Sequence, residues 1–187
     1  MASLQLHFRN GSFVPYCGGA LIRPNWVLTA AHCKITIALG QDLLAVLGIH
    51  SLSKIERSQQ RLRIIRQIPI TKFNNLTMKD DIMLLQLETD AKINQYVNVL
   101  NLPKGGITDM KSGTTCTVAG WGKTKINNYS DTLQEVEVKG DSGGPLICNK
   151  MYTGIVSFGK GCAIAKKPGV YTLLTKRYID WIRDTIG

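Results

Sequence analysis

The run Gly140-Asp141-Ser142-Gly143-Gly144-Pro145 places one serine in a segment dense in backbone-bending residues. A serine hydroxyl becomes a useful nucleophile only when a base removes its proton and a third group orients that base. Glycines adopt backbone conformations closed to other residues. The N–H groups of Gly140 and Ser142 can therefore converge on a developing oxyanion. A plain glycine-rich turn is the simpler interpretation, but six residues are far more specific than a bare Asp-Ser-Gly, and we expect a nucleophile loop.

Two other segments supply the candidate base and its orienting acid. The base is His32 in LTAAHC (28–33), where small alanines permit a tight turn and the next cysteine offers a covalent anchor. His7 and His50 lack such a setting and are interpreted as structural or surface residues. The acid is Asp81, at the edge of an apolar run. A carboxylate there is shielded from water and can accept from an imidazole, although Asp81 alone would be interpreted as a turn residue.

The elements that position these side chains are predicted to be mainly strands. Short apolar runs recur between clusters of Gly, Asn, Asp and Ser, a pattern typical of an all-β barrel or sandwich. The expected strands lie within 20–22, 26–28, 43–47, 62–68 and 82–87, and after a hinge at 103–106 within 116–121, 133–138, 145–148, 154–158 and 169–174. The tail predicts a helix by its apolar stripe, Leu174, Tyr178, Trp181 and Ile182.

The bulk composition limits the class of protein. With 187 residues, 44% of them hydrophobic, the chain fits one ordinary domain or two small, closely packed ones. It has no apolar run of about 18 residues, so we expect no membrane span. The start, MASLQLHFRNGSF, lacks the features of a signal peptide, and any leader would lie outside this chain.

The net charge of +10 favours anionic partners. Its densest patch runs from Arg57 to Arg66, where Arg61 and Arg63 alternate with apolar residues and would share the solvent face of a strand. Anionic proteoglycans are the candidate partner for this strand, and a merely soluble basic surface is the alternative. No aromatic residues interleave with the arginines, so we expect no nucleic acid partner.

The five cysteines form no Cys-x-x-Cys pair, which argues against zinc fingers and thioredoxin-like redox motifs. Asn-x-Ser/Thr sequons begin at Asn10, Asn75 and Asn128. Together with well-separated cysteines they indicate a secretory compartment. The odd cysteine count indicates that one cysteine lacks its partner.

The phrases LTAAHC, DDIMLL and GDSGGPL, in this order, resemble the trypsin-like serine proteases with a double β-barrel fold. CGGALI (17–22), VAGWG (118–122) and PGVY (168–171) match as well, so the resemblance covers nearly the whole chain. MASLQ, LGIHSLSK and GVYTLLTK look most like the tryptase granzymes of the A and K type, proteases of cytotoxic lymphocyte granules.

This resemblance implies an all-β fold of two six-stranded antiparallel Greek-key barrels, the second incomplete here, and a C-terminal α-helix. Residues 1–106 would form the first barrel, carrying His32 and Asp81. Residues 107–187 would form the truncated second barrel, carrying Ser142 and the helix. The implied activity is that of a secreted or granule serine endopeptidase that cleaves protein substrates after Lys or Arg through an acyl-enzyme, without cofactor or metal.

The resemblance also assigns roles to single residues. His32 would be the general base, Asp81 its orienting acid and Ser142 the nucleophile. Gly140 and Ser142 would form the oxyanion hole.

Four residues would bind substrate. Ser157, Phe158 and Gly159 would pair with its backbone, while Gly159 and Gly169 leave the primary specificity pocket open.

The implied disulfides are Cys17–Cys33, beside His32, and Cys116–Cys148.

The chain departs from the family at two places. It starts at Met1, which matches an internal position, so the N-terminus that would pair with Asp141 is absent. A few dozen residues are missing between Val138 and Lys139, including the pocket base and the partner of Cys162, which we expect to be a free thiol. The alternative hypotheses are therefore an inactive splice or truncation form, acting at most as a cationic glycan- or protein-binding module, and a product that does not fold stably.

Overall fold

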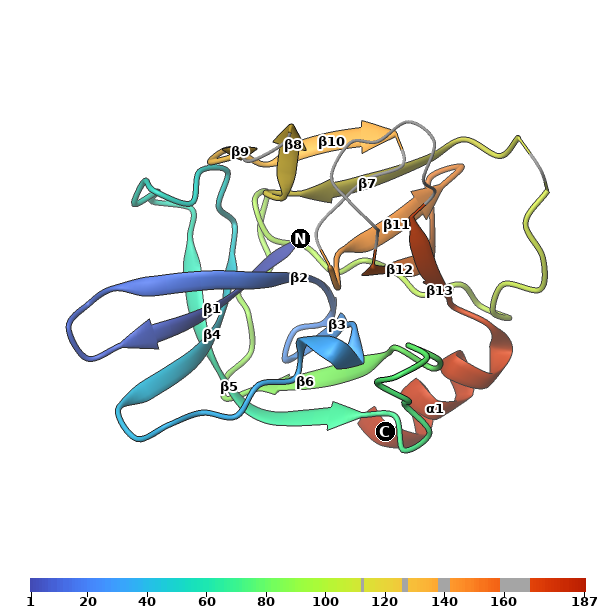
Figure 1. The fold of residues 1–187 in the computed structure, drawn as a ribbon, viewed down its shortest axis with the longest axis horizontal. Helices are drawn as coiled ribbons and strands as arrows, with labels where there is room; N and C mark the ends of the chain where they lie inside the picture. Colours follow the sequence, from blue (N-terminus) through green and yellow to red (C-terminus); the bar gives the residue numbers. More distant parts are fainter. Residues whose placement is uncertain (112, 126–127, 138–141, 159–168) are drawn as a thin grey trace.

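The structure is a computed structural model of the 187-residue chain and describes residues 1–111, 113–125, 128–137, 142–158 and 169–187 (Figure 1). Four residues singled out from the sequence, Gly140, Asp141, Gly159 and Cys162, lie outside the described residues, as does the junction at 138–139.

A closed antiparallel barrel of six strands fills the first part of the chain (Figure 1). Its strands are β1 (Ala2–Phe8), β2 (Phe13–Arg23), β3 (Trp26–Thr29), β4 (Gln41–Leu47), β5 (Gln60–Pro69) and β6 (Met83–Leu87), hydrogen-bonded in the closed order β1-β2-β3-β6-β5-β4. Apolar side chains fill its interior: Leu4, Leu28, Leu43 and Leu85 are at most 1% exposed. The one-turn 3-10 helix η1 (Ala31–Cys33) follows β3 and carries His32.

The second part of the chain forms a five-stranded antiparallel sheet that is open within the described ranges. It consists of β10 (Gln134–Glu137), β7 (Cys116–Gly120), β11 (Pro145–Cys148), β12 (Met151–Phe158) and β13 (Val170–Leu173), in that order. A separate two-stranded ribbon pairs β8 (Lys123–Lys125) with β9 (Asn128–Tyr129). One closed barrel and one incomplete sheet confirm the expected fold class.

The helix α1 (Lys176–Ile186) ends the chain, as its apolar stripe predicts. Its residues Ile179 and Ile182 are buried in one apolar cluster. The same cluster contains Ile82, which directly precedes β6, and Ile155 of β12. One apolar cluster therefore joins the helix, the first barrel and β12, whereas Val118, Leu146 and Val156 of the second sheet belong to a separate cluster. No helix in the described part of the chain is long and apolar enough to cross a membrane.

Candidate active site

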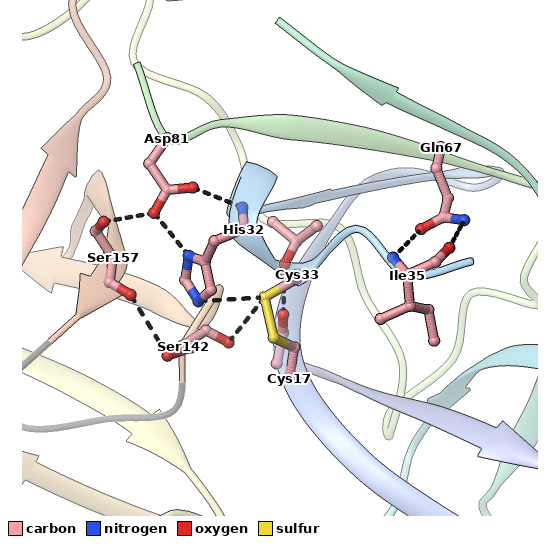
Figure 2. The surroundings of a disulfide bond; sticks show 10 residues. Cys17, His32, Cys33, Ile35, Gln67, Asp81, Ser142 and Ser157 are labelled. Carbon is pink, nitrogen blue, oxygen red and sulfur yellow. Dashed lines mark hydrogen bonds and ion pairs between the residues drawn. A yellow bond between two sulfur atoms is a disulfide. The ribbon is translucent and has the colours of Figure 1, made fainter. Parts of the chain in front are cut away.

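The centre of the site is the carboxylate of Asp81, which is completely buried. Its Oδ2 lies 2.7 Å from Nδ1 of His32, and its Oδ1 accepts the backbone N–H of His32 at 2.8 Å (Figure 2). An ionised carboxylate can only accept, so Nδ1 carries the proton of the neutral ring and Nε2 is left as the acceptor. This pair of bonds fixes both the ring and the backbone of η1.

Ser157 of β12 provides a third donor to Asp81. Its hydroxyl donates to Oδ2 at 2.5 Å, and the residue is 1% exposed. Burial is the largest influence on the Asp81 carboxyl and would raise its pKa. The hydrogen bonds from His32 and Ser157 and the charge of His32 outweigh it and lower the pKa of Asp81 below its ordinary value of 3.8. Asp81 therefore stays ionised at neutral pH although it is shielded from water.

His32 is anchored from both sides along the chain. Ala30 and Ala31 are at most 2% exposed, so these small side chains let η1 pack closely on the barrel. The disulfide Cys17–Cys33 joins β2 to η1, with its Cα atoms 6.2 Å apart. The imidazole keeps 22% of its side-chain surface exposed. One ring nitrogen thus faces a buried carboxylate, while the ring as a whole remains accessible to a bound molecule.

The loop that carries Ser142 docks against the first barrel. The Gly18 N–H donates to the Ser142 carbonyl at 2.8 Å, and the Gly143 N–H donates to the Val156 carbonyl at 2.7 Å. Gly143 has φ +82°, and a Cβ there would clash with Oγ1 of Thr29. Only glycine fits this close approach in this conformation. The glycine-rich run therefore serves to bring Ser142 onto the barrel that carries His32.

The Ser142 hydroxyl donates to the carbonyl of Ser157 at 3.4 Å (Figure 2). No hydrogen bond between the described residues joins it to His32. Cys33 Sγ packs 3.8 Å from Nε2 of His32 and 3.8 Å from the Ser142 carbonyl, and a disulfide sulfur has no proton to donate. The structure therefore brings Ser142, His32 and Asp81 together, with the serine hydroxyl turned towards Ser157.

The residues expected to bind substrate lie at the adjoining strand ends where they are described. Phe158 is the last residue of β12 and pairs with Val170 of β13, and Gly169 immediately precedes that strand. A Cβ on Gly169 would meet the hydroxyl of Tyr171 at 2.6 Å. Ser157 lies closest to the site, and its bond to Asp81 is a contact that the sequence interpretation missed. The signal for it was the position of this serine inside the otherwise apolar run 154–158.

The second expected disulfide, Cys116–Cys148, joins β7 to β11 with a Cα separation of 4.1 Å. Among the described residues, one trio offers potential metal ligands close together, Cys17, His32 and Cys33, within 4.8 Å of one another. Both of its sulfur atoms are joined in the disulfide. This trio therefore provides no thiolate for a metal ion.

Comparisons of the sequence with known proteins point to one family. The family model described as Trypsin matches residues 1–139 and 137–182. Granzyme A from Bos taurus is 38% identical over 91% of this chain and 79% of its own length. Mast cell protease 3 from Ovis aries is 36% identical over 100% of this chain and 83% of its own length. Cathepsin G from Homo sapiens is 35% identical over 100% of this chain and 82% of its own length. The family match divides at 137–139, next to the junction where a segment is expected to be missing.

Proposed function

The chain belongs to the trypsin family of serine-type endopeptidases, and on that premise we propose that His32, Asp81 and Ser142 form its catalytic triad. The observation that carries this proposal is the buried Asp81 carboxylate, which accepts both Nδ1 and the backbone N–H of His32. That arrangement presents Nε2 as a base beside the loop that holds Ser142. For general-base activation the serine hydroxyl turns from the Ser157 carbonyl to Nε2.

The reaction then follows from these positions. Ser142 Oγ attacks the carbonyl carbon of the scissile peptide bond while its proton passes to Nε2 of His32. Asp81 stabilises the resulting imidazolium. Collapse of the tetrahedral intermediate breaks the carbon–nitrogen bond, and the leaving amine takes the proton from Nε2. Water then attacks the acyl-enzyme, gives a proton to Nε2 and restores the Ser142 hydroxyl.

This chemistry also requires that the negative charge on the tetrahedral intermediate be stabilised. We propose that the N–H groups of Gly140 and Ser142 bind the oxyanion, as preorganised backbone donors do. The hydrogen bond from Gly18 to the Ser142 carbonyl supports this role for Ser142, because it holds the residue that bears this N–H against the barrel. The assignment of Gly140 stays a prediction from the motif.

Substrate is proposed to extend along Ser157, Phe158 and Gly159, with the side chain before the cleaved bond near Gly159 and Gly169. Support comes from β12, which ends at the site with Ser157 and Phe158 and pairs there with the start of β13. We propose cleavage after Lys or Arg on the resemblance to tryptase granzymes. Two disulfides, which persist in oxidising compartments, support a secreted or granule location.

Hydrolysis of a fluorogenic peptide series tests this proposal. Peptides with Lys or Arg before the reporter group should be cleaved and those with Phe or Leu should not. Ser142→Ala should lower kcat about 10⁶-fold, the scale for loss of a triad nucleophile. Equal cleavage of the Phe peptides would overturn the specificity alone. Cleavage that survives Ser142→Ala would overturn the triad.

A second function, binding of an anionic glycan, is favoured by a separate surface. A cavity of about 440 Å³ is lined by Arg57, Lys92 and five polar residues, Ser58, Gln59, Gln60, Asn94 and Tyr96. The Gln60 amide exchanges two hydrogen bonds with the backbone of Lys92, at 2.7 and 2.8 Å, and so holds the two sides together. Neither Arg57 nor Lys92 has a carboxylate partner among the described residues.

The adjoining strand extends this basic surface. Arg61 and Arg63 are both exposed on β5, as predicted, although Arg63 is paired with Asp42 at 3.2 Å. An irregularity in the pairing of β5 with β6, between Ile64 and Arg66, ends the simple alternation of arginines with apolar residues along the strand.

Elution from immobilised heparin tests glycan binding. The double variant Arg57→Ala/Lys92→Ala should elute at clearly lower salt than the parent, because two unpaired charges at the cavity are lost. Lys111→Ala/Lys150→Ala removes the same charge from exposed positions elsewhere and should elute close to the parent. Equal shifts for the two pairs would contradict a site at this cavity. Binding without peptide hydrolysis would identify the chain as an inactive binding module.

A further inference from the structure

Asp80, the residue before Asp81, is a second buried carboxylate that the proposed chemistry does not use. It is 7% exposed and has φ +58°, in the left-handed region that few residues other than glycine adopt. The N–H of Ile82 donates to the Asp80 carbonyl at 2.9 Å. This bond closes a three-residue turn with Asp81 at its centre. The direction of the Asp81 side chain therefore depends on how this turn is held.

The first turn of α1 holds it. The Tyr178 hydroxyl donates to Oδ1 of Asp80 at 2.6 Å, and Arg177 Nη2 lies 3.1 Å from the same oxygen. The Arg177 guanidinium also lies over the Tyr178 ring, 5.3 Å from its centre. In Figure 1 the helix lies beside the green segment that leads into β6. Residues 98 positions apart in the sequence thus meet at this turn.

The helix is itself fixed, so it can hold the turn in place. Ile179 and Ile182 are at most 1% exposed and lie in the same apolar cluster as Ile82, the last residue of the turn. Burial is the largest influence on Asp80 and would raise its pKa, but the Tyr178 and Arg177 hydrogen bonds and the charges of Arg177 and Lys79 lower it below its ordinary value. Asp80 therefore stays ionised and keeps both partners at neutral pH.

The two adjacent carboxylates have separate partners. Asp80 is bound by α1, whereas Asp81 is bound by His32 and Ser157. We infer that Asp80 is a positioning residue, whose bonds to Tyr178 and Arg177 orient the turn that directs Asp81 at His32. This inference rests on the proposed triad. It gives the C-terminal helix a part in the alignment of the site.

Removal of the Tyr178 hydroxyl tests the inference. Tyr178→Phe should lower kcat about tenfold at unchanged KM, within the range that misplaced catalytic groups show. The low-field proton resonance of His32 Nδ1–H should also move upfield or broaden, because its acceptor is less well aligned. Thr185→Val is the matched control, since it removes another hydroxyl bond of α1, to the Trp181 carbonyl at 2.7 Å, far from Asp80. It should change neither quantity.

Further variants separate alignment from folding. Asp80→Asn keeps an acceptor oxygen and should recover most of the kcat lost in Asp80→Ala. Arg177→Met changes a side chain that is 50% exposed and should lower kcat in the same direction by less, even if Tyr178→Phe does not fold. A Tyr178→Phe protein with parental kcat and an unmoved resonance would overturn the inference. The resonance is read without substrate, so it decides the role of Asp80 even where the parent hydrolyses no peptide.

Discussion

Three hydrogen bonds reach one buried carboxylate at Asp81, and they determine what His32 can do. Two of the donors belong to His32 and the third is Ser157. An acceptor in this position selects the His32 tautomer whose Nε2 is free to take a proton.

Asp81→Asn should therefore lower kcat by about 10⁴-fold, the loss described for the orienting aspartate of such triads. The amide can donate to Nδ1 and so favours the wrong tautomer. Steady-state hydrolysis of a peptide substrate measures this effect. Asp180→Asn changes an exposed carboxylate paired with Lys176 on α1 and should leave kcat unchanged. A loss in Asp81→Asn no larger than in this control would contradict the assigned role.

Gly143 carries a second prediction at this scale. Gly143→Ala should destabilise the protein by at least about 1 kcal/mol, because its positive φ is strained for alanine. Its Cβ would also fall 2.5 Å from the Gly18 carbonyl. Gly105→Ala has no neighbour within 4 Å and should be close to neutral. Urea unfolding of the two variants compares them directly, and equal midpoints would show that the loop does not dock as described.

The sequence predicted the residues with motifs around them and missed those without. His32, Asp81 and Ser142 each stand in a recognisable phrase, and the structure brings them together. The bonds of Ser157 and Asp80 depend on partners 76 and 98 residues away. The position of Ser157 in an apolar run marks this serine as unusual, but no local pattern identifies either partner. The orientation of the Ser142 hydroxyl likewise depends on the neighbouring strand and not on the motif.

At the scale of elements, the two disulfides join different pairs and should have different effects. Cys17–Cys33 spans 16 residues and holds η1, whereas Cys116–Cys148 spans 32 and joins β7 to β11. Chain entropy predicts a loss of about 3 kcal/mol for removal of the first and about 0.6 kcal/mol more for the second.

Serine replacements of each cysteine pair test this prediction. The Cys17/Cys33 variant should lose activity beyond its loss of stability, because His32 lies inside η1. The Cys116/Cys148 variant should be the less stable of the two, as measured by urea unfolding. Full activity in a folded Cys17/Cys33 variant would show that the disulfide does not position His32.

Most strands and the helix were predictable, but three strands were not: β8 and β9, which form the short separate ribbon, and β1 of the barrel. Apolar residues alternate with polar ones along β1 as well, but no strand was predicted there. In the structure β1 pairs with both β2 and β4 and closes the barrel. Its polar residues Ser3 and Gln5 are buried and bond to each other, so this strand is covered on both faces.

At the scale of the whole molecule, the lowered pKa values of Asp80 and Asp81 predict acid sensitivity. A carboxyl whose pKa is lower in the folded state than its ordinary value of 3.8 stabilises the fold when the pH is above 3.8. This contribution is lost as the pH falls from 3.8 through the pKa of the folded state. The free energy of unfolding should therefore drop below pH 3.8. Asp80→Asn should show a shallower drop over that range in urea titrations. Parallel curves for parent and variant would contradict the pKa shift at Asp80.

The first barrel, β12 of the second sheet and α1 share one apolar cluster, so the position of Ser142 relative to His32 depends on contacts between both parts of the chain. The division into 1–106 and 107–187 stays a prediction. The place of the expected missing segment, at the junction of 138 and 139, could be read from the sequence because the strand before it runs directly into the nucleophile loop.

Reaction with a fluorophosphonate probe tests the central claim most directly, because the probe labels a serine only when a base activates it and an oxyanion site accepts the adduct. The folded parent should be labelled at Ser142, with labelling abolished in Ser142→Ala and strongly reduced in His32→Ala. A parent chain that unfolds cooperatively and yet takes up no label would contradict the proposal that this triad is catalytic.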